Sequence, residues 1–223
     1  MKKIIFYLFC VLLFLTLFWQ AILHIRIVER HVAPISIVIT IPEGFNITQI
    51  GNAFTLKLKN FNQTQFLLEA EGLEGYLFPD TYFFLTNANE KDVIKSMSDN
   101  FKKKINPLLG EIIFSGRTEK DIIIMASIIE REAEGDIDRG VISGILWKRI
   151  SISMPLQVDS VLATYKVKGL PKNSIGNPGL EAIKAALYPQ SSPYLYYLHD
   201  KNGNIHYAKD FIEHTKNKLK YLK

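Results

Sequence analysis

Cysteine is almost absent from this chain of 223 residues, and its one cysteine, Cys10, lies inside an apolar segment near the N-terminus. The rest of the chain can form no internal disulfide, so a hydrophobic core of its own has to stabilise it. Cys10 also stands too early in the apolar segment to be a lipid-attachment site. The single cysteine therefore excludes a disulfide scaffold, and its position excludes a lipoprotein.

An excess of one charge is also lacking, since 27 basic residues face 22 acidic ones. The small basic excess gathers at the C-terminus, where it fits the solvated face of a last helix: Lys216, Lys218, Lys220 and Lys223. So mild an excess does not predict nucleic-acid binding. The sequence shows no glycine-rich phosphate loop and no convincing Ser-His-Asp order. We therefore expect neither a nucleic-acid partner nor a cofactor.

One long apolar run is present, from Ile4 to Leu23, where only Thr16 and Gln20 are polar. At 1.5 Å per residue, such a run spans about the 30 Å of a hydrocarbon core. The lysines that precede it favour an N-terminus on the inner side. A cleavable signal peptide has a shorter apolar core, followed by a small-residue cleavage site that is missing here. The sequence thus predicts a single-pass anchor over residues 1–25, with the remainder extracytoplasmic.

Beyond that run the patterns predict an α+β protein. Isoleucines at every second position predict a strand over 34–41, and Pro42-Glu43-Gly44 then turns the chain. A short helix capped by Asn46 or Thr48 should follow, then further helices over 62–71, 90–109, 118–134 and 138–150. The segment over 154–164 is expected to be loop and strand.

The C-terminal third carries clear start and turn signals. Asn177 is expected to cap a helix whose first residue is Pro178 and which runs to Leu187. Asn202-Gly203 predicts a two-residue hairpin turn, and Asp210 should cap a last helix. The strongest capping signal lies earlier, where Thr118 and Asp121 approximate a capping box.

Glu130 is the most informative candidate for chemistry. On a helix its neighbours are small or apolar, namely Ile123, Ala126, Ser127 and Ala133. A carboxyl group on such a face is partly desolvated, which favours the protonated form that a general acid requires. The alternative is a boundary glutamate paired with Arg131 or a distant lysine. Glu132 and Glu134 are expected to be ordinary solvated helix charges.

Other candidates carry weaker signals. Gln157 and Asp159 follow the helix pair on an extended segment, where turn chemistry is the alternative. His199 and His206 should lie opposite each other in the hairpin, but a cross-strand pair without a third ligand does not predict a metal site. The segment over 72–84 is rich in aromatic residues and forms either a packed core loop or a wall for a sugar ligand.

Six segments in order resemble one family, the YceG-like (MltG) endolytic murein transglycosylases. Residues 73–82 read LEGYLFPDTY, and residues 126–133 read ASIIEREA, close to that family's ASIIEKEA helix. The other blocks are MPLQVD at 154–159, KGLP at 168–171, NPGLEAIKAA at 177–186 and YLYY at 194–197. The resemblance runs from about residue 37 to about residue 216.

The resemblance implies a lytic transglycosylase that cuts peptidoglycan strands between N-acetylmuramic acid and N-acetylglucosamine and leaves 1,6-anhydromuramyl ends. It implies that Glu130 is the catalytic acid and base. One carboxyl group is enough, because the sugar's own 6-hydroxyl attacks in place of water. Guesses for the glycan cleft are Gln157, Asn177, Tyr76, Tyr82 and His206, with core packing as the alternative for the two tyrosines.

The implied setting is a bacterial inner (cytoplasmic) membrane, where peptidoglycan strands and cell-wall synthases such as penicillin-binding proteins are the expected partners. The alternative is a non-catalytic glycan-binding or scaffold protein of the wall-synthesis machinery. We expect a linker and a truncated LysM-like module over 26–71 and the catalytic domain over 72–223. Two family asparagines are replaced, by Lys148 and Ala163, and the loop before Thr164 is short. The sequence leaves two alternatives for the effect of these differences, a fully active enzyme and a weakened one.

Overall fold

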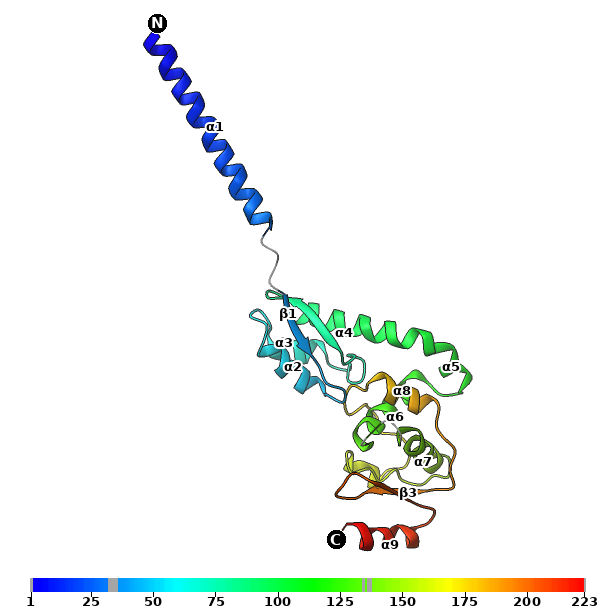
Figure 1. The fold of residues 1–223 in the computed structure, drawn as a ribbon. Helices are drawn as coiled ribbons and strands as arrows, with labels where there is room; N and C mark the ends of the chain where they lie inside the picture. Colours follow the sequence, from blue (N-terminus) through cyan, green and yellow to red (C-terminus); the bar gives the residue numbers. More distant parts are fainter. Residues whose placement is uncertain (1, 32–35, 134, 136–137, 223) are drawn as a thin grey trace. The chain divides into compact units, whose positions relative to one another are not determined.

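The computed structural model describes all residues except 1, 32–35, 134, 136–137 and 223. It divides into two compact units, Met1–Ser36 and Ile37–Lys223. The first unit holds helix α1 (Lys2–His31) (Figure 1).

Helix α1 corrects the predicted membrane anchor. It continues past residue 25 to His31 and so includes the charged Arg26, Glu29 and Arg30. Within the described part of the chain, no helix has the length and apolarity that a membrane crossing needs. The predictions of an anchor over 1–25 and of a single-pass location in the bacterial inner membrane are therefore wrong.

The second unit begins with a small sheet and three helices. Strands β1 (Ser36–Thr40) and β2 (Thr81–Leu85) pair, and the backbone N–H of Ile41 donates to the carbonyl of Asp80 at 3.0 Å just beyond them. Helices α2 (Ile47–Thr55) and α3 (Gln63–Glu69) lie between the strands in sequence, and α4 (Glu90–Ile105) follows β2. Strand β2 lies in the aromatic segment that was expected to be a loop or wall.

These elements share one hydrophobic cluster, whose members come from both sides of residue 72 in the sequence. Ile50, Phe54 and Phe66 precede that residue, and Phe84 and Met97 are among the members that follow it. Residues 37–71 thus belong to the same packed core as β2 and α4. The domain boundary at 71/72 and the LysM-like character of the first part stay predictions.

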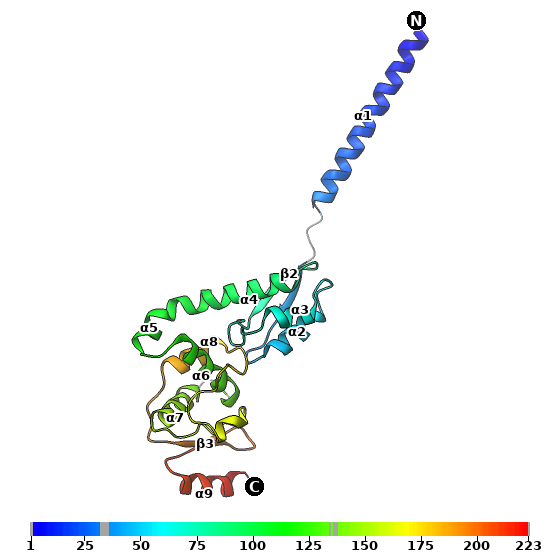
Figure 2. The same ribbon diagram turned by 180° about the vertical axis from the view of Figure 1, so that it is seen from behind.

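The remaining elements are mostly helical, as Figures 1 and 2 show from opposite sides. A 3₁₀ turn (Asn106–Leu108) leads into α5 (Leu109–Phe114). Helices α6 (Glu119–Glu132), α7 (Arg139–Ser151) and α8 (Leu180–Leu187) form the middle of the unit, with a 3₁₀ turn (Leu162–Tyr165) before α8. Hairpin β3 (Tyr196–His199) and β4 (Ile205–Ala208) and the last helix α9 (Phe211–Tyr221) lie at the far end from β1 and β2. The α+β class is confirmed.

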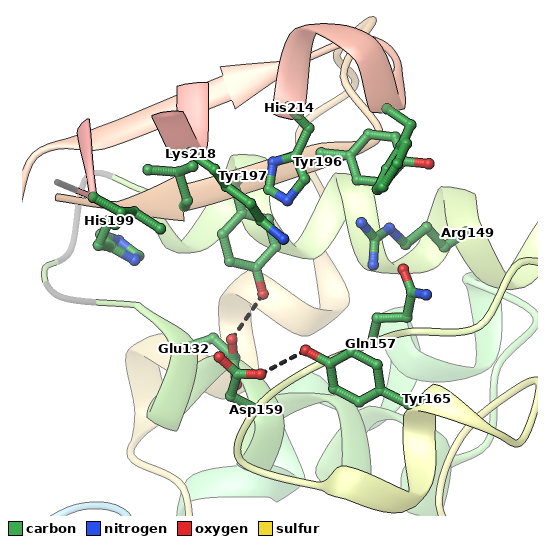
Figure 3. Close-up of a pocket in the computed structure, with 13 residues that line it drawn as sticks. Glu132, Arg149, Gln157, Asp159, Tyr165, Tyr196, Tyr197, His199, His214 and Lys218 are labelled. Carbon is green, nitrogen blue, oxygen red and sulfur yellow. Dashed lines mark hydrogen bonds between the residues drawn. The ribbon is translucent and has the colours of Figure 1, made fainter. Parts of the chain in front are cut away.

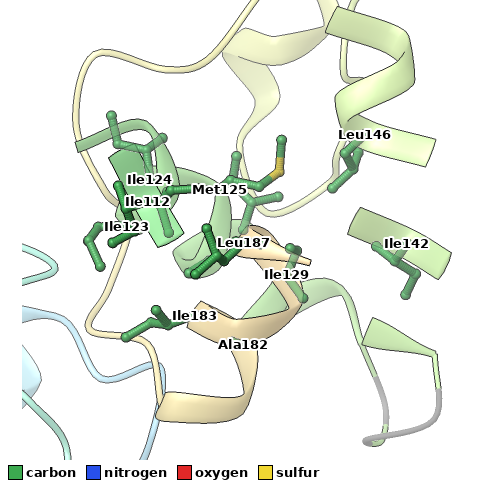
Figure 4. Close-up of a cluster of buried hydrophobic side chains, with 14 of the residues drawn as sticks. Ile112, Ile123, Ile124, Met125, Ile129, Ile142, Leu146, Ala182, Ile183 and Leu187 are labelled. Carbon is green, nitrogen blue, oxygen red and sulfur yellow. The ribbon is translucent and has the colours of Figure 1, made fainter. Parts of the chain in front are cut away.

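The main core surrounds α6. All eight residues from Ile122 to Ile129 are buried, and α8 packs closely against them through Ala182, Ile183 and Ala186. Figure 4 shows α8 and the α7 residues Ile142 and Leu146 around this helix. Glu130 follows directly on these eight buried residues, in the last turn of α6.

Local capping was partly foreseen. The capping boxes of Thr118 with Asp121 and the cap of Asp210 are confirmed, and Asn46 rather than Thr48 caps α2. Helix α8, however, begins at Leu180 with Gly179 as its N-cap, so the prediction of Asn177 as cap is wrong.

The hairpin forms at the predicted place, but the predicted two-residue turn is wrong: the Asp200 N–H donates to the carbonyl of Asn204 at 2.9 Å, which leaves three residues, 201–203, in the turn. The extra residue shifts the register and separates the two histidines. His199 pairs with Ile205, and His206 pairs with Leu198. Successive side chains of a strand point to opposite faces, so His199 and His206 do not face each other as expected.

Candidate active site

Glu130 lies in the last turn of α6 with its side chain only 6% exposed. Its Oε1 accepts a hydrogen bond from Nη2 of Arg139 at 3.0 Å, and its Oε2 accepts one from the backbone N–H of Gly179 at 2.8 Å. The ion-pair partner is therefore an arginine on α7 rather than the adjacent Arg131. Both carboxyl oxygens are fixed by donors from other parts of the chain.

The loop over residues 42–45 lies against the same glutamate. Its backbone is tied to the segment before α8, because Gly44 N–H donates to the carbonyl of Asn177 at 2.8 Å and Asn177 N–H donates to the carbonyl of Phe45 at 2.9 Å. Gly44 has a φ of +78°, and a Cβ there would lie 3.5 Å from Cγ of Glu130. At Gly179, a Cβ would overlap the carboxylate of Glu43. This loop thus brings Glu43 next to the residue that binds Glu130.

Asn177 holds three segments together with a fully buried side chain. Its Oδ1 accepts from the backbone N–H groups of Gly75 and Leu77, and its Nδ2 donates to the carbonyl of Phe45 and to Oε1 of Glu74, each at 2.9 Å. Burial raises the pKa of Glu74, while hydrogen bonds from the Ile47 N–H and Asn177 oppose that rise. A direct glycan contact of Asn177 stays a prediction.

A cavity of about 470 Å³ opens beside the end of α6 (Figure 3). Its lining combines carboxylates, aromatic rings and cationic groups: Glu132, Arg149, Gln157, Asp159, Tyr165, Tyr196, Tyr197, Leu198, His199, Phe211, His214, Lys218 and Leu222. Gln157, one of the predicted cleft residues, lies here with a positive φ of 51°. A left-handed backbone at a non-glycine residue is uncommon, and such strain is found often at binding sites.

Glu132 is not the solvated helix charge that was expected. One of its oxygens accepts from the Ser160 hydroxyl at 2.7 Å and the other from the Tyr197 hydroxyl at 3.0 Å. Burial and the Glu132 carboxylate raise the pKa of Tyr197 well above its ordinary value. Across the cavity, the hydroxyl of Tyr165 donates to Asp159 at 2.5 Å, and this bond raises the pKa of Tyr165 to about 12.

The opposite wall carries the cationic groups. Arg149 is buried, donates from Nε to the carbonyl of Leu195 at 2.6 Å, and lies over the ring of Tyr196 at 4.9 Å. Burial lowers the pKa of Arg149 and that of His214. Nδ1 of His214 and Nε2 of His199 are buried without a hydrogen-bond partner among the described residues. The cavity therefore offers ring faces to a ligand, and its wall contains two buried polar atoms without a partner among the described residues.

The other predicted cleft residues lie elsewhere. Tyr82 is buried, and its hydroxyl donates to the carbonyl of Phe78 at 2.6 Å; burial is the main reason that its pKa rises to about 12. Tyr76 packs edge-on against Phe101 and lines two smaller cavities. His206 bonds Asp200 at 3.0 Å and stacks on Tyr221.

The five predicted cleft residues are thus not gathered at one place. Gln157 lines the main cavity and Asn177 supports the loop beside Glu130, whereas the glycan contacts predicted for the other three rest on the resemblance alone.

Three residues at the site were missed from the sequence. In the sequence, Arg139 appears only as a helix residue, Glu43 only as a turn residue and Gly179 only as part of a helix start. For Glu43, the one available signal was a carboxylate within a Pro-Glu-Gly turn. The roles of Arg139 and Gly179 depend on long-range contacts that spacing along the chain does not reveal.

The fold is mixed α+β, and the end of α6 carries both the oriented carboxyl group of Glu130 and, two residues later, Glu132 in the wall of the polar, ring-lined cavity, which Glu130 itself does not line. Residues 20–163 and 162–220 match the model of the YceG-like family. The chain belongs to the YceG-like family.

Two relatives are both named endolytic murein transglycosylase. The one from Bacillus subtilis (strain 168) is 33% identical over 173 residues, covering 67% of this chain and 48% of the relative. The one from Streptococcus pneumoniae serotype 2 (strain D39 / NCTC 7466) is 26% identical over 178 residues, covering 67% of this chain and 32% of the relative. The matched region thus spans about half the length of these relatives or less.

A crystal structure of a YceG-like protein from Listeria monocytogenes has a similar fold. The TM-score is 0.74 at 28% sequence identity, and the match covers 84% of this chain and 77% of that one. The mixed α+β architecture of residues 37–223 is therefore the architecture of this family.

Proposed function

We propose that this protein is an endolytic murein transglycosylase. It cleaves the bond between N-acetylmuramic acid and N-acetylglucosamine within peptidoglycan strands and leaves 1,6-anhydromuramyl ends. The observation that carries this proposal is the placement of Glu130, whose shielded carboxyl group is oriented by Arg139 and Gly179 at the end of the most deeply buried helix. The names of the two relatives support the same substrate.

The proposed reaction needs one group that both gives and takes a proton. Glu130 protonates the glycosidic oxygen as the bond from C1 of the muramic sugar breaks. The 6-hydroxyl of the same sugar then attacks C1, and its proton returns to Glu130, which ends the cycle as it began. Because Nη2 of Arg139 donates to Oε1 and the Gly179 N–H donates to Oε2, one of these donors has to leave the carboxyl group before it reaches the glycosidic oxygen.

The cavity beside α6 is the proposed place for the glycan next to the cleaved bond. The rings of Tyr196 and Tyr197 offer faces to sugars, and Gln157, His199 and His214 offer polar atoms. We keep Gln157 as a direct contact and Asn177 as a residue that holds the site in shape. Glycan contacts of Tyr76, Tyr82 and His206 remain part of the proposal, supported by the resemblance alone. A cell-wall synthase remains the proposed protein partner on the same ground.

A second function has one observation in its favour. Glu130 is almost fully buried and ion-paired, which is also how a glutamate with only a structural role would lie. In that case the protein is a non-catalytic glycan-binding or scaffold protein of the wall-synthesis machinery.

Substitution of Glu130 separates the two functions. Glu130→Gln keeps the size of the side chain but cannot transfer a proton, so we expect the release of anhydromuramyl products to fall by a factor of about 10² to 10⁴. The products are measured by mass spectrometry on purified glycan strands, and circular dichroism checks the fold.

A surface carboxylate provides the control. Glu181→Gln, in the exposed pair with Lys184 on α8, should leave the rate unchanged, since such pairs contribute little. Glu132 is unsuitable because it lines the cavity. A folded Glu130→Gln protein with the wild-type rate would remove Glu130 from the mechanism. A wild type that binds strands but releases no product would favour the scaffold function.

A further inference from the structure

We infer that Glu43 is a second carboxylate of the active site, where it stabilises the positive charge that develops on the sugar. This inference rests on the proposed function. It concerns the turn Pro42-Glu43-Gly44. In the sequence this turn directly follows the alternating isoleucines of the predicted first strand, and it gives no other signal.

The first support is that Glu43 and Glu130 meet at one residue. Gly179 donates its N–H to Oε2 of Glu130 at 2.8 Å, and the carboxylate of Glu43 occupies the space that a side chain on Gly179 would need. With ordinary backbone dimensions between them, the two carboxylates lie at most about 7 Å apart. Carboxyl pairs of glycoside hydrolases act at separations of about 5 to 9.5 Å.

The second support is that the turn is held in place by bonds outside itself. Gly44 N–H and the carbonyl of Phe45 both bond Asn177, whose side chain also binds Phe45 and Glu74. On the other side of the turn, Ile41 N–H bonds the carbonyl of Asp80. Glu43 is an exposed residue, although the backbone that carries it is fixed.

The third support is the backbone of Gly179. Its φ of −75° and ψ of 171° are open to any residue, so nothing in the backbone requires a glycine there. What excludes a side chain is the Glu43 carboxylate. The glycine therefore serves the close approach of the turn to the segment that binds Glu130.

The chemistry assigns different tasks to the two groups. As the bond from C1 to the leaving oxygen breaks, the sugar ring gains oxocarbenium-like positive charge. Glu130 gives its proton to the leaving oxygen and later accepts one from the 6-hydroxyl, whereas Glu43 stays ionised throughout. A fixed negative charge near the ring stabilises this transition state more than the neutral ground state, so it raises kcat.

The experiment uses the full chain and soluble, defined glycan strands. For Glu43→Gln we expect kcat to fall by about 10² with KM nearly unchanged and with anhydromuramyl ends still the product. Glu43→Asp keeps the charge and should be more active than Glu43→Gln. Glu43→Ala should regain part of its rate in sodium formate but not in sodium chloride, because formate replaces the carboxylate.

Exposed Glu71, in the same part of the chain, provides the matched control, and Glu71→Gln should keep the wild-type kcat. If Glu43→Gln is folded and keeps the wild-type kcat while Glu130→Gln is inactive, the inference is overturned and the proposed function stands. Equal rates for Glu43→Gln and Glu43→Asp, without formate rescue of Glu43→Ala, also overturn it. A wild type without anhydromuramyl products ends both the proposed function and this inference.

Discussion

At the scale of single residues, the site depends on polar side chains whose partners lie far away in sequence. Glu130 bonds Gly179, and Asn177 bonds Gly75 across 102 positions. The spacing of residues on α6 was enough to single out Glu130, because its helix neighbours are local. Its partner Arg139 was not predictable, since a second helix supplies it. Neighbours on one element can be read from periodicity, but partners from other elements cannot.

Asn177→Ala is expected to destabilise the protein strongly. The substitution removes four hydrogen bonds from a fully buried side chain and leaves the N–H groups of Gly75 and Leu77 without their acceptor. Each buried group left unsatisfied costs about 1 to 3 kcal/mol, so we expect a loss of about 2 to 5 kcal/mol in the free energy of unfolding. Urea denaturation followed by circular dichroism measures it.

Asn173→Ala is the control, since Asn173 is exposed in the same loop. It should change the unfolding free energy by less than about 0.5 kcal/mol. If both variants unfold at the wild-type urea concentration, Asn177 does not hold the three segments together, and the loop over 42–45 must be fixed in another way.

At the scale of elements, the helices were more predictable than the sheets. Thr118 and Asp210 act through neighbours three positions away, so their caps were visible in the sequence, and Asn202-Gly203 located the hairpin although not the length of its turn. Strand β2 was not, because its five residues lie in an aromatic segment and pair with a strand about 40 positions earlier. From the sequence, the aromatic residues of that segment fit a packed core loop as well as a sugar wall, because their burial depends on that distant pairing.

The contact between α9 and the hairpin is expected to weaken at acidic pH. His214 of α9 is buried on the ring of Tyr196, and burial, Lys218 and Arg149 lower its pKa. The unfolded chain therefore binds a proton more readily than the folded one. Stability is complete above the ordinary histidine pKa of about 6.5 and falls below it, by at most about 1.4 kcal/mol per pH unit from this group.

Thermal unfolding at pH 7.5 and at pH 5.5 measures this loss. His214→Phe keeps a ring against Tyr196 but cannot bind a proton, so its midpoint should fall less between the two pH values than the wild-type midpoint. An equal fall in both proteins would show that other groups cause the acid sensitivity.

At the scale of the molecule, two hydrophobic clusters underlie the unit over 37–223. One surrounds α6, and the other joins α2 and α3 with β2 and α4. The sequence predicted a small module before residue 72 and a catalytic domain after it, and the family match supports the overall architecture. The second cluster makes these two parts mutually dependent for their packing. Sequence periodicity locates apolar faces but does not say which distant face covers them.

A fragment that begins at Gly72 is therefore expected not to fold on its own. The large buried side chains that it would lack include Ile39, Ile41, Ile50, Phe54 and Phe66. At about 1.5 to 3 kcal/mol each, their loss matches the whole stability of a typical domain, about 5 to 15 kcal/mol. Strand β2 would lose its partner, and Phe84 and Met97 would lose the side chains that cover them.

The matched fragment begins at Ile37 and keeps both clusters, so it should unfold cooperatively in urea as one unit. It should also release anhydromuramyl products, because it contains Glu43, Glu130 and the whole cavity lining. If the fragment from Gly72 unfolds with the same midpoint and slope as the fragment from Ile37, residues 37–71 add nothing to the core. If it folds but is inactive, those residues act at the active site alone, which is where the turn that carries Glu43 lies.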